Sequence, residues 1–311
     1  ETLHGAFDPD LPPVLTIDPG DRVIVRTLDA GWTVRGFEDL GLPGDADRAV
    51  YALRDPERDR GHALCGPIRI VGAEPGMVLA VRIGEIVPGD YGWNFGSTRP
   101  NGINDHLRVE GDPLRVEWAI DAERGTATSA FGHRVRIAPF FGVMGMPPAE
   151  PGSHPTSPPR PTGGNIDCRD LVAGSTFFLP VAVPGGLFSV GDGHARQSDG
   201  EGSTTAIECP IQAGTLTFDL RDDLELAYPI AWTPDAWITF GFDPDLDAAA
   251  LIALNAMLDL LQREFGIERK LALSLASAVV DLRVTQIVNG VRGIHAVLRH
   301  DAVEVVAPDR P

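Results

Sequence analysis

The stretch GDGHARQSDGE, residues 191–201, joins two aspartates, a histidine, a glutamine and a glutamate to glycines, and GSTTAIE continues it to Glu208. Because glycine has no side chain, it lets the backbone come close to a ligand that the neighbouring polar side chains bind. Asp192 and His194 stand two residues apart, so an extended backbone would direct both side chains to one face. The stretch therefore predicts a strand that carries a polar site, and the rest of the chain is expected to support that strand.

The rest of the chain is predicted to be mainly β. Glycine (35 residues) and proline (27 residues) are spread along the chain, which is typical of many turns between short strands. Further strands are expected at 114–120, 133–138, 177–183, 237–242 and 282–288. Four segments place a glycine in a turn just before an apolar run: DPGDRVIV from Asp18, EPGMVLAV from Glu74, VAGSTFFL from Val172 and QAGTLTFDL from Gln212. This pattern favours a β-sandwich or barrel-like core.

The C-terminal part has helical periodicity. Leucines recur at three- and four-residue spacing over 246–265, and Gly266 follows as a stop signal. A second helix is expected over 268–278, leading into a strand. We therefore expect a β-rich domain over 1–233 and an α+β unit over 234–311 packed against it, or one integrated domain with a soft boundary near Pro234.

Two stretches are expected to lack regular structure, 91–108 and the proline-rich 144–164. Long ordered loops inside a compact domain are usually functional. The second loop ends where the polar residues of GGNIDCRD begin, so we expect it to form a wall of a site.

The formal charge of −18 argues against binding to nucleic acid or to an anionic membrane surface, because phosphates would be repelled. No run of 18 apolar residues and no signal-peptide pattern occurs, so a cytoplasmic location is expected. The three cysteines do not form a disulfide scaffold, and without a CxxC pair a thiolate zinc site is improbable.

Asp199 and Glu201 repeat the spacing of Asp192 and His194, and Gln197 lies between the two pairs. If the segment folds back as strand, turn and strand, four ionisable groups converge, which is costly unless a cation or a shared proton offsets their charge. Two alternatives are a solvated polar hairpin and a calcium loop. The spacing fits no EF-hand, and histidine is a poor calcium ligand.

Asn165 and Asp167 are again spaced for one face, and an amide with a carboxylate could hold a small carboxamide, although an Asx turn is the alternative. Asp29 at the end of a strand and His62 before a turn are further candidates. Cys168 would serve as a nucleophile only with a base nearby, and most lone cysteines are buried apolar residues.

Three stretches resemble the acetamidase/formamidase family in the same order: HALCGPIRIVGAEPGMVLAVRI, GGNIDCRDLVAGSTFFLPVAVPGGLFSVGDGHARQSDGEGSTTAIE and DLRVTQIVNGVRGIHAVL. The resemblance covers most of the chain and points to the compact, acetamidase-like branch. It departs at Ser198 and Thr204, where family members commonly have glycine. The motif residues carry over to Asn165, Asp167, Asp192, His194, Gln197, Asp199 and Glu201.

The resemblance implies a metal-associated, mostly β protein that tends to form homo-oligomers and hydrolyses a short-chain amide to a carboxylic acid and ammonia. On the residues, Asp192 and His194, completed by Asp29, are predicted to bind zinc, with calcium as the other option.

Glu201 is predicted to be the general base, with its pKa raised by burial and by Asp199. Asn165, Asp167 and Gln197 are predicted to hold the substrate. The competing hypothesis is a non-catalytic β-sandwich that binds a metal or a small ligand through the same residues.

Overall fold

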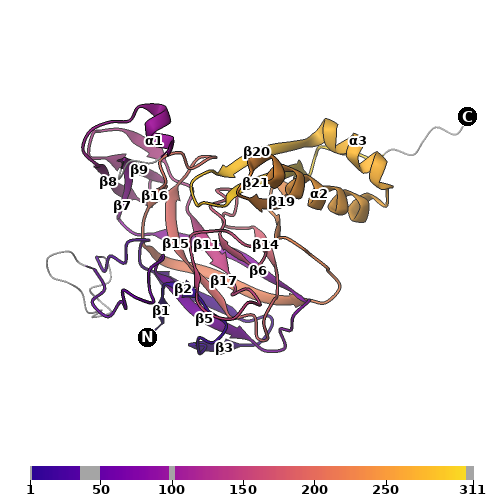
Figure 1. The fold of residues 1–311 in the computed structure, drawn as a ribbon, viewed down its shortest axis with the longest axis horizontal. Coiled ribbons are helices and arrows are strands. Elements are labelled where there is room, and N and C mark those ends of the chain that lie inside the picture. Colours follow the sequence, from indigo (N-terminus) through magenta and orange to yellow (C-terminus); the bar gives the residue numbers. More distant parts are fainter. Residues whose placement is uncertain (1, 36–49, 98–101, 306–311) are drawn as a thin grey trace, which may run out of the picture.

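The computed structural model describes residues 2–35, 50–97 and 102–305 and consists mainly of two large sheets. Figure 1 shows the strands stacked as the body of the molecule, with the C-terminal helices at one end. Eleven strands form the first sheet, in which β15 pairs with β5, β11 and β16. They are β1 (Leu3–His4), β3 (Leu15–Ile17), β5 (Leu64–Ile70), β7 (Tyr91–Ser97), β8 (Leu114–Asp121), β9 (Thr126–Ser129), β10 (Arg134–Arg136), β11 (Phe140–Gly145), β13 (Gly163–Asn165), β15 (Phe188–Arg196) and β16 (Ile207–Glu208).

The second sheet has eight strands in the order β20-β21-β19-β18-β14-β6-β17-β4. They are β4 (Arg22–Thr27), β6 (Val78–Pro88), β14 (Thr176–Pro180), β17 (Ile211–Arg221), β18 (Ile230–Trp232), β19 (Ala236–Asp243), β20 (Val280–Gln286) and β21 (Arg292–Arg299). A small separate sheet joins β2 (Ala6–Phe7) to β12 (His154–Pro155). The eight-stranded sheet runs across Pro234, so the C-terminal strands continue the same sheet as the strands before it.

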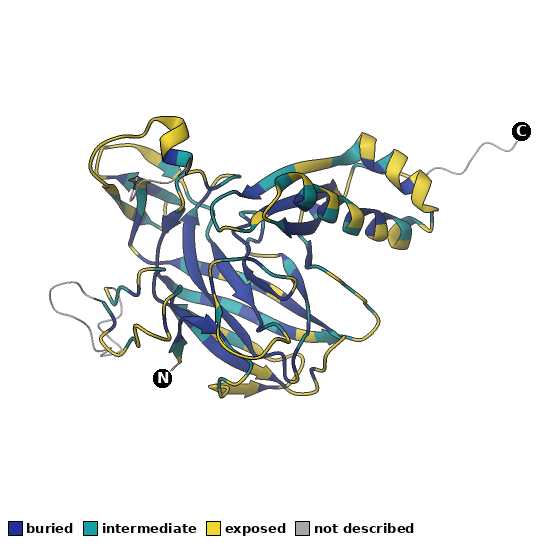
Figure 2. Ribbon diagram, viewed as in Figure 1, coloured by how far each residue is buried: buried dark blue, intermediate teal, exposed yellow. Residues whose placement is uncertain are grey.

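The main core lies between the two large sheets. Phe188 on β15 meets Phe218 on β17 with ring centroids 5.2 Å apart. Figure 2 shows the central strands buried and the outer faces of the C-terminal helices exposed. The predicted fold class, a mainly β sandwich-like core with an α+β C-terminal part, is confirmed.

Three of the four predicted turn-then-strand segments are confirmed. Gly20, Gly76 and Gly174 have φ values of 95°, 95° and 94° and precede β4, β6 and β14. The fourth prediction is wrong, because Gly214 lies inside β17. A Cβ there would stand 2.4 Å from the Phe141 ring, so this glycine makes room for an aromatic ring of the facing sheet.

The expected loop over 91–108 is also wrong for its described residues. β7 occupies its first part, pairing with β8 and β16, and α1 (Gly102–Leu107) occupies its last part. Residues 98–101 lie outside the described residues. The stretch 144–164 is mostly irregular as expected, and it leads through β13 to Asn165.

The helices follow their sequence signals closely. α2 (Leu246–Phe265) begins after Asp245, whose side chain accepts a hydrogen bond from the Ala248 amide at 2.9 Å, and ends at Gly266 in the left-handed conformation. α3 (Arg269–Val279) follows and leads directly into β20. No helix within the described ranges is both long and apolar enough to cross a bilayer.

Helix α2 packs closely on β19 at Gly241. A Cβ at this glycine would stand 2.0 Å from the Ala249 carbonyl oxygen and 2.5 Å from the Ala253 amide nitrogen. Beside it, the Thr239 hydroxyl donates to the Ala253 carbonyl at 2.7 Å. Any side chain at position 241 therefore has to move the helix away from the sheet.

We expect Gly241→Ala to lower the free energy of unfolding by about 1–3 kcal/mol, the usual cost of overpacking a core. Equilibrium denaturation in urea measures it. Ser277→Ala on the exposed side of α3 is the matched control and should change little. Equal stability of Gly241→Ala and the parent would contradict the close packing.

Candidate active site

The site is built around His194 on β15. Its Nε2 atom lies 3.4 Å from Asp192 Oδ2 and 3.3 Å from Glu208 Oε2, and all three side chains are buried. β15 brings Asp192 and His194 together as their spacing predicted. Phe140 packs edge-on against the imidazole at 4.9 Å between ring centroids, which fixes the plane of the ring.

Glu208 is a candidate site residue that the sequence interpretation missed. It belongs to β16, which pairs with β15 so that Glu208 stands opposite His194. Its Oε1 atom accepts a hydrogen bond from the Ala206 amide at 2.9 Å, which leaves Oε2 directed at the imidazole. The signal was the glutamate ending TAIE, but only cross-strand pairing shows that it reaches His194.

A second group of carboxylates adjoins the first. Asp167, His194 and Glu201 form one set whose ligand atoms lie within 4.8 Å of one another, and Asp192, His194 and Glu208 form another. The two sets share the imidazole. The structure therefore gathers four carboxylates and one histidine at one buried point.

Gly142 on β11 lies directly against this cluster of side chains. A Cβ there would stand 2.5 Å from Asp192 Oδ2, 2.7 Å from His194 Cε1 and 2.8 Å from Asp167 Oδ1. Two side chains from β15 and one from the segment after β13 thus converge on the space that a methyl group would fill. The absence of a side chain at 142 is what permits their approach.

Three of the four carboxylates sit on backbone in the left-handed region. Asp167, Asp192 and Glu201 have φ values of 53°, 57° and 46°. Aspartate adopts this conformation more readily than most residues, but for a glutamate such as Glu201 it costs about 1–2 kcal/mol. Backbone strain of this kind concentrates at functional sites, because the surrounding structure must enforce it.

Several buried polar atoms at this point have no hydrogen-bond partner among the described residues. Buried polar groups are nearly always hydrogen-bonded, so a cluster of exceptions indicates a place for a bound group. Carboxylate oxygens and an imidazole nitrogen are ligands that zinc takes, and oxygens alone suit calcium. The donors present therefore fit a divalent cation. The atoms are Asn165 Oδ1, Asp167 Oδ1, Asp192 Oδ1, His194 Nδ1, Gln197 Oε1, Glu201 Oε2 and Glu208 Oε2.

The charges of the site are strongly shifted. Burial raises the pKa of Glu201 and the pKa of Glu208 to about 8, which the nearby carboxylates reinforce. Burial alone would raise the pKa of Asp192, but His62 and His194 hold it below its usual value. Burial alone would lower the pKa of His194, but Glu208 and Asp192 raise it well above the usual value. Positive charge is therefore favoured at the centre of the site.

The site opens to solvent through a cleft of about 270 Å³. Asn165, Asp192, Glu201 and Glu208 line its inner end. His62 lies at the mouth, where Nδ1 contacts the Thr156 hydroxyl at 2.8 Å and Nε2 is 4.0 Å from Asp192 Oδ2.

Thr204, a departure from the family pattern, also lines the cleft. It has a φ of 72°, a conformation that glycine adopts without cost.

Asp29 does not reach the cluster. It is fully buried, but Oδ1 accepts from the Thr33 amide at 2.9 Å, and Oδ2 accepts from Trp93 Nε1 at 2.9 Å and from the Tyr91 hydroxyl at 3.3 Å. Its carboxylate is thus occupied by neutral donors. Glu208, and not Asp29, stands beside Asp192 and His194.

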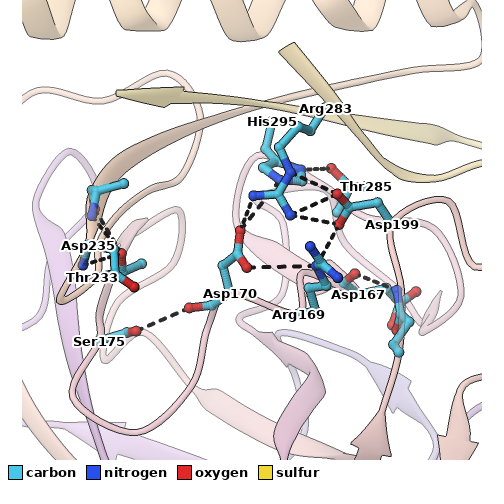
Figure 3. Close-up of polar contacts among 12 residues, drawn as sticks. Asp167, Arg169, Asp170, Ser175, Asp199, Thr233, Asp235, Arg283, Thr285 and His295 are labelled. Carbon is cyan, nitrogen blue, oxygen red and sulfur yellow. Dashed lines mark hydrogen bonds and ion pairs between the residues drawn. The ribbon is translucent and has the colours of Figure 1, made fainter. Parts of the chain in front are cut away.

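Asp199 is also outside the cluster. Arg283 holds it through two hydrogen bonds, at 2.7 and 3.0 Å, and Arg169 approaches it at 3.0 Å. Figure 3 shows these arginines between Asp170 and Asp199. The segment after Arg196 does not fold back as a strand before β16, so Asp199 and Glu201 diverge instead of repeating the geometry of Asp192 and His194.

The two remaining candidates, Gln197 and Cys168, lie outside the group of carboxylates around His194. Gln197 donates from Nε2 to the Asp167 carbonyl oxygen at 2.7 Å and so braces the backbone of that residue. Cys168 is buried in a separate group with Asp170 and His295, and burial raises the pKa of its thiol. A buried, protonated thiol is a poor nucleophile.

The chain is similar to known amidases in sequence. It is 28% identical over 310 residues to a putative formamidase of Schizosaccharomyces pombe, with 78% of this chain and 73% of the relative covered. It is also 28% identical over 254 residues to a formamidase of Methylophilus methylotrophus, covering 64% of this chain and 59% of that protein. Against this second relative, the chain therefore spans less than two thirds of the relative's length.

The fold is shared as well. An acetamidase from Bacillus halodurans superposes with a TM-score of 0.81 at 27% identity, covering 96% of this chain and 95% of that one. The profile of the Acetamidase/Formamidase family matches residues 1–154 and 149–235. The chain therefore belongs to the acetamidase/formamidase family and is an amidase.

Proposed function

We propose that the chain hydrolyses a short-chain aliphatic amide to a carboxylic acid and ammonia, with a divalent metal in the buried carboxylate cluster. The observation that carries the proposal is the convergence of Asp192, His194 and Glu208 with unpartnered donor atoms at the inner end of the cleft. The names of the relatives, formamidase and acetamidase, support a small acyl group.

Asp192, His194 and Glu208 would hold the metal. Zinc takes imidazole nitrogens and carboxylate oxygens as ligands, whereas calcium prefers oxygen ligands alone, so we favour zinc. A metal held there supplies the positive charge that polarises an amide carbonyl and makes water a stronger acid. It would also offset the negative charge of the buried carboxylates.

Glu201 is our candidate for the proton carrier. It lies next to Asp167 and His194 at the inner end of the cleft, and burial raises its pKa above the usual value for a glutamate, which suits a group that takes up and releases a proton. It would accept a proton from the attacking water and pass it to the departing nitrogen. Amide nitrogen leaves poorly unless it is protonated, so this transfer is needed for turnover.

Asn165 is placed to hold the substrate amide. It is buried at the end of β13, lines the cleft and has an unpartnered Oδ1 atom that can accept from the NH2 group of the substrate. Asp167 lies beside it. Formation of homo-oligomers stays a prediction, which light scattering of the purified protein would test.

The metal requirement is tested by ammonia release from formamide, acetamide and propionamide, with and without a chelator. We expect release that stops on chelation, returns on adding zinc and is unaffected by iodoacetamide, since Cys168 is buried. Ammonia release that resists chelation but is lost with iodoacetamide would contradict the metal mechanism. No release from any amide would favour a binding protein.

We expect Glu201→Gln to lower kcat by about a hundredfold to ten-thousandfold with metal still bound, because the amide cannot carry the proton. Steady-state kinetics with metal analysis of the same sample measures this. Glu117→Gln, at a half-exposed glutamate on β8, is the matched control and should keep full activity. Full turnover by the metal-loaded Glu201→Gln variant would rule out Glu201 as the proton carrier.

Gly142→Ala should abolish stoichiometric metal binding. The new methyl group would occupy the point where Asp192, His194 and Asp167 converge. Metal content after dialysis measures the effect, and circular dichroism checks that the variant is folded. Gly202→Ala is the control, because a Cβ at Gly202 meets no atom within 4 Å. A folded Gly142→Ala variant that retains metal like the parent would contradict the proposed position.

A further inference from the structure

The loop between β20 and β21 reaches into the site from the C-terminal part of the chain. Asn289 in this loop donates from Nδ2 to Asp167 Oδ2 at 2.7 Å, and it also lines the cleft. The two residues are 122 positions apart in sequence. The contact is therefore made by the fold and not by local chain geometry.

The loop is held in shape by Gln286, which is fully buried. Its Oε1 atom accepts from the amides of Val288 and Asn289 at 2.9 and 3.1 Å, and its Nε2 atom donates to the Val291 carbonyl at 2.7 Å. One side chain thus uses both ends of its amide to fix the backbone that carries Asn289. The position of Asn289 is set before any ligand binds.

The end of β20 and the loop after it also hold the backbone next to Glu201. The Gly200 amide donates to the Thr285 carbonyl at 3.0 Å, and the Ile287 amide donates to the Gly200 carbonyl at 3.3 Å. Asp167 and Glu201, which come from separate segments, are therefore both anchored on residues 285–289. Residues 285–289 therefore contribute to the placement of both side chains.

The chemistry of the contact is directional. The Nδ2 group of asparagine can only donate, so it requires Asp167 Oδ2 to accept. Asp167 Oδ1 is then the oxygen without a partner among the described residues, and it faces the space above Gly142 together with Asp192 Oδ2. Asn289 therefore selects which oxygen of Asp167 is presented to the centre of the site.

We propose that Asn289 is a positioning residue for the amidase reaction, holding Asp167 so that its free oxygen faces the metal and substrate. The inference rests on the proposed function. Residues that orient metal-ligating side chains commonly contribute about 10- to 100-fold to metal affinity or activity. A merely structural asparagine would instead contribute to the stability of the loop.

Two variants separate these roles. Asn289→Ala removes the donor, and Asn289→Asp keeps the size of the side chain but replaces the donor by a carboxylate. Asn255→Ala on α2 is the matched control, since Asn255 contacts Arg269 at the surface. Each protein is loaded with cobalt, and its visible d–d spectrum, kcat/KM on acetamide and unfolding midpoint are measured.

We expect both Asn289 variants to lose kcat/KM by about 10- to 100-fold. Both should shift the cobalt spectrum, while their unfolding midpoints stay close to that of the parent. Variants with the spectrum and kcat/KM of the parent would overturn the role. So would losses confined to Asn289→Ala, or losses that follow the unfolding midpoint.

Failure of the proposed function has a different signature. A parent that binds cobalt but releases no ammonia from amides contradicts the proposed reaction, and the cobalt spectra then still decide whether Asn289 positions Asp167. A parent that neither binds cobalt nor hydrolyses amides overturns both proposals together.

Discussion

Four carboxylates buried around one imidazole form the constraint on which the rest of this structure depends. Burying a carboxylate without a compensating charge or hydrogen bonds is costly, and here Asp167, Asp192, Glu201 and Glu208 are gathered around the imidazole of His194. Three of these acids also sit on backbone in the left-handed region. We propose that a divalent cation bound among these carboxylates offsets their negative charge.

The two sheets provide the rigidity that this arrangement needs. β15 lies inside the eleven-stranded sheet, where it pairs with β5, β11 and β16. The glycine at position 142 leaves the space in which the side chains of the site meet. The C-terminal part contributes directly to the site, since residues 285–289 hold both Asp167 and the backbone beside Glu201. The site is thus assembled from both sides of the expected boundary near Pro234.

Much of this was predictable where the signal is local. Helix α2 has visible periodicity and caps, and the spacing of Asp192 and His194 predicted their shared face. Contacts that depend on strand pairing were not predictable, which is why Glu208 was missed. Asp29 was misplaced because nothing in its neighbourhood shows that Trp93 and Tyr91 occupy its oxygens. Asp199 was misplaced because its partner Arg283 is 84 residues away.

The most direct test is elemental analysis of the purified protein and of Glu208→Gln, each assayed for amidase activity in the same preparation. The account predicts a stoichiometric divalent metal and ammonia release in the parent, and loss of both in the variant, because Glu208 would supply one of three ligands. Full amidase activity in a parent that carries no stoichiometric metal would contradict it.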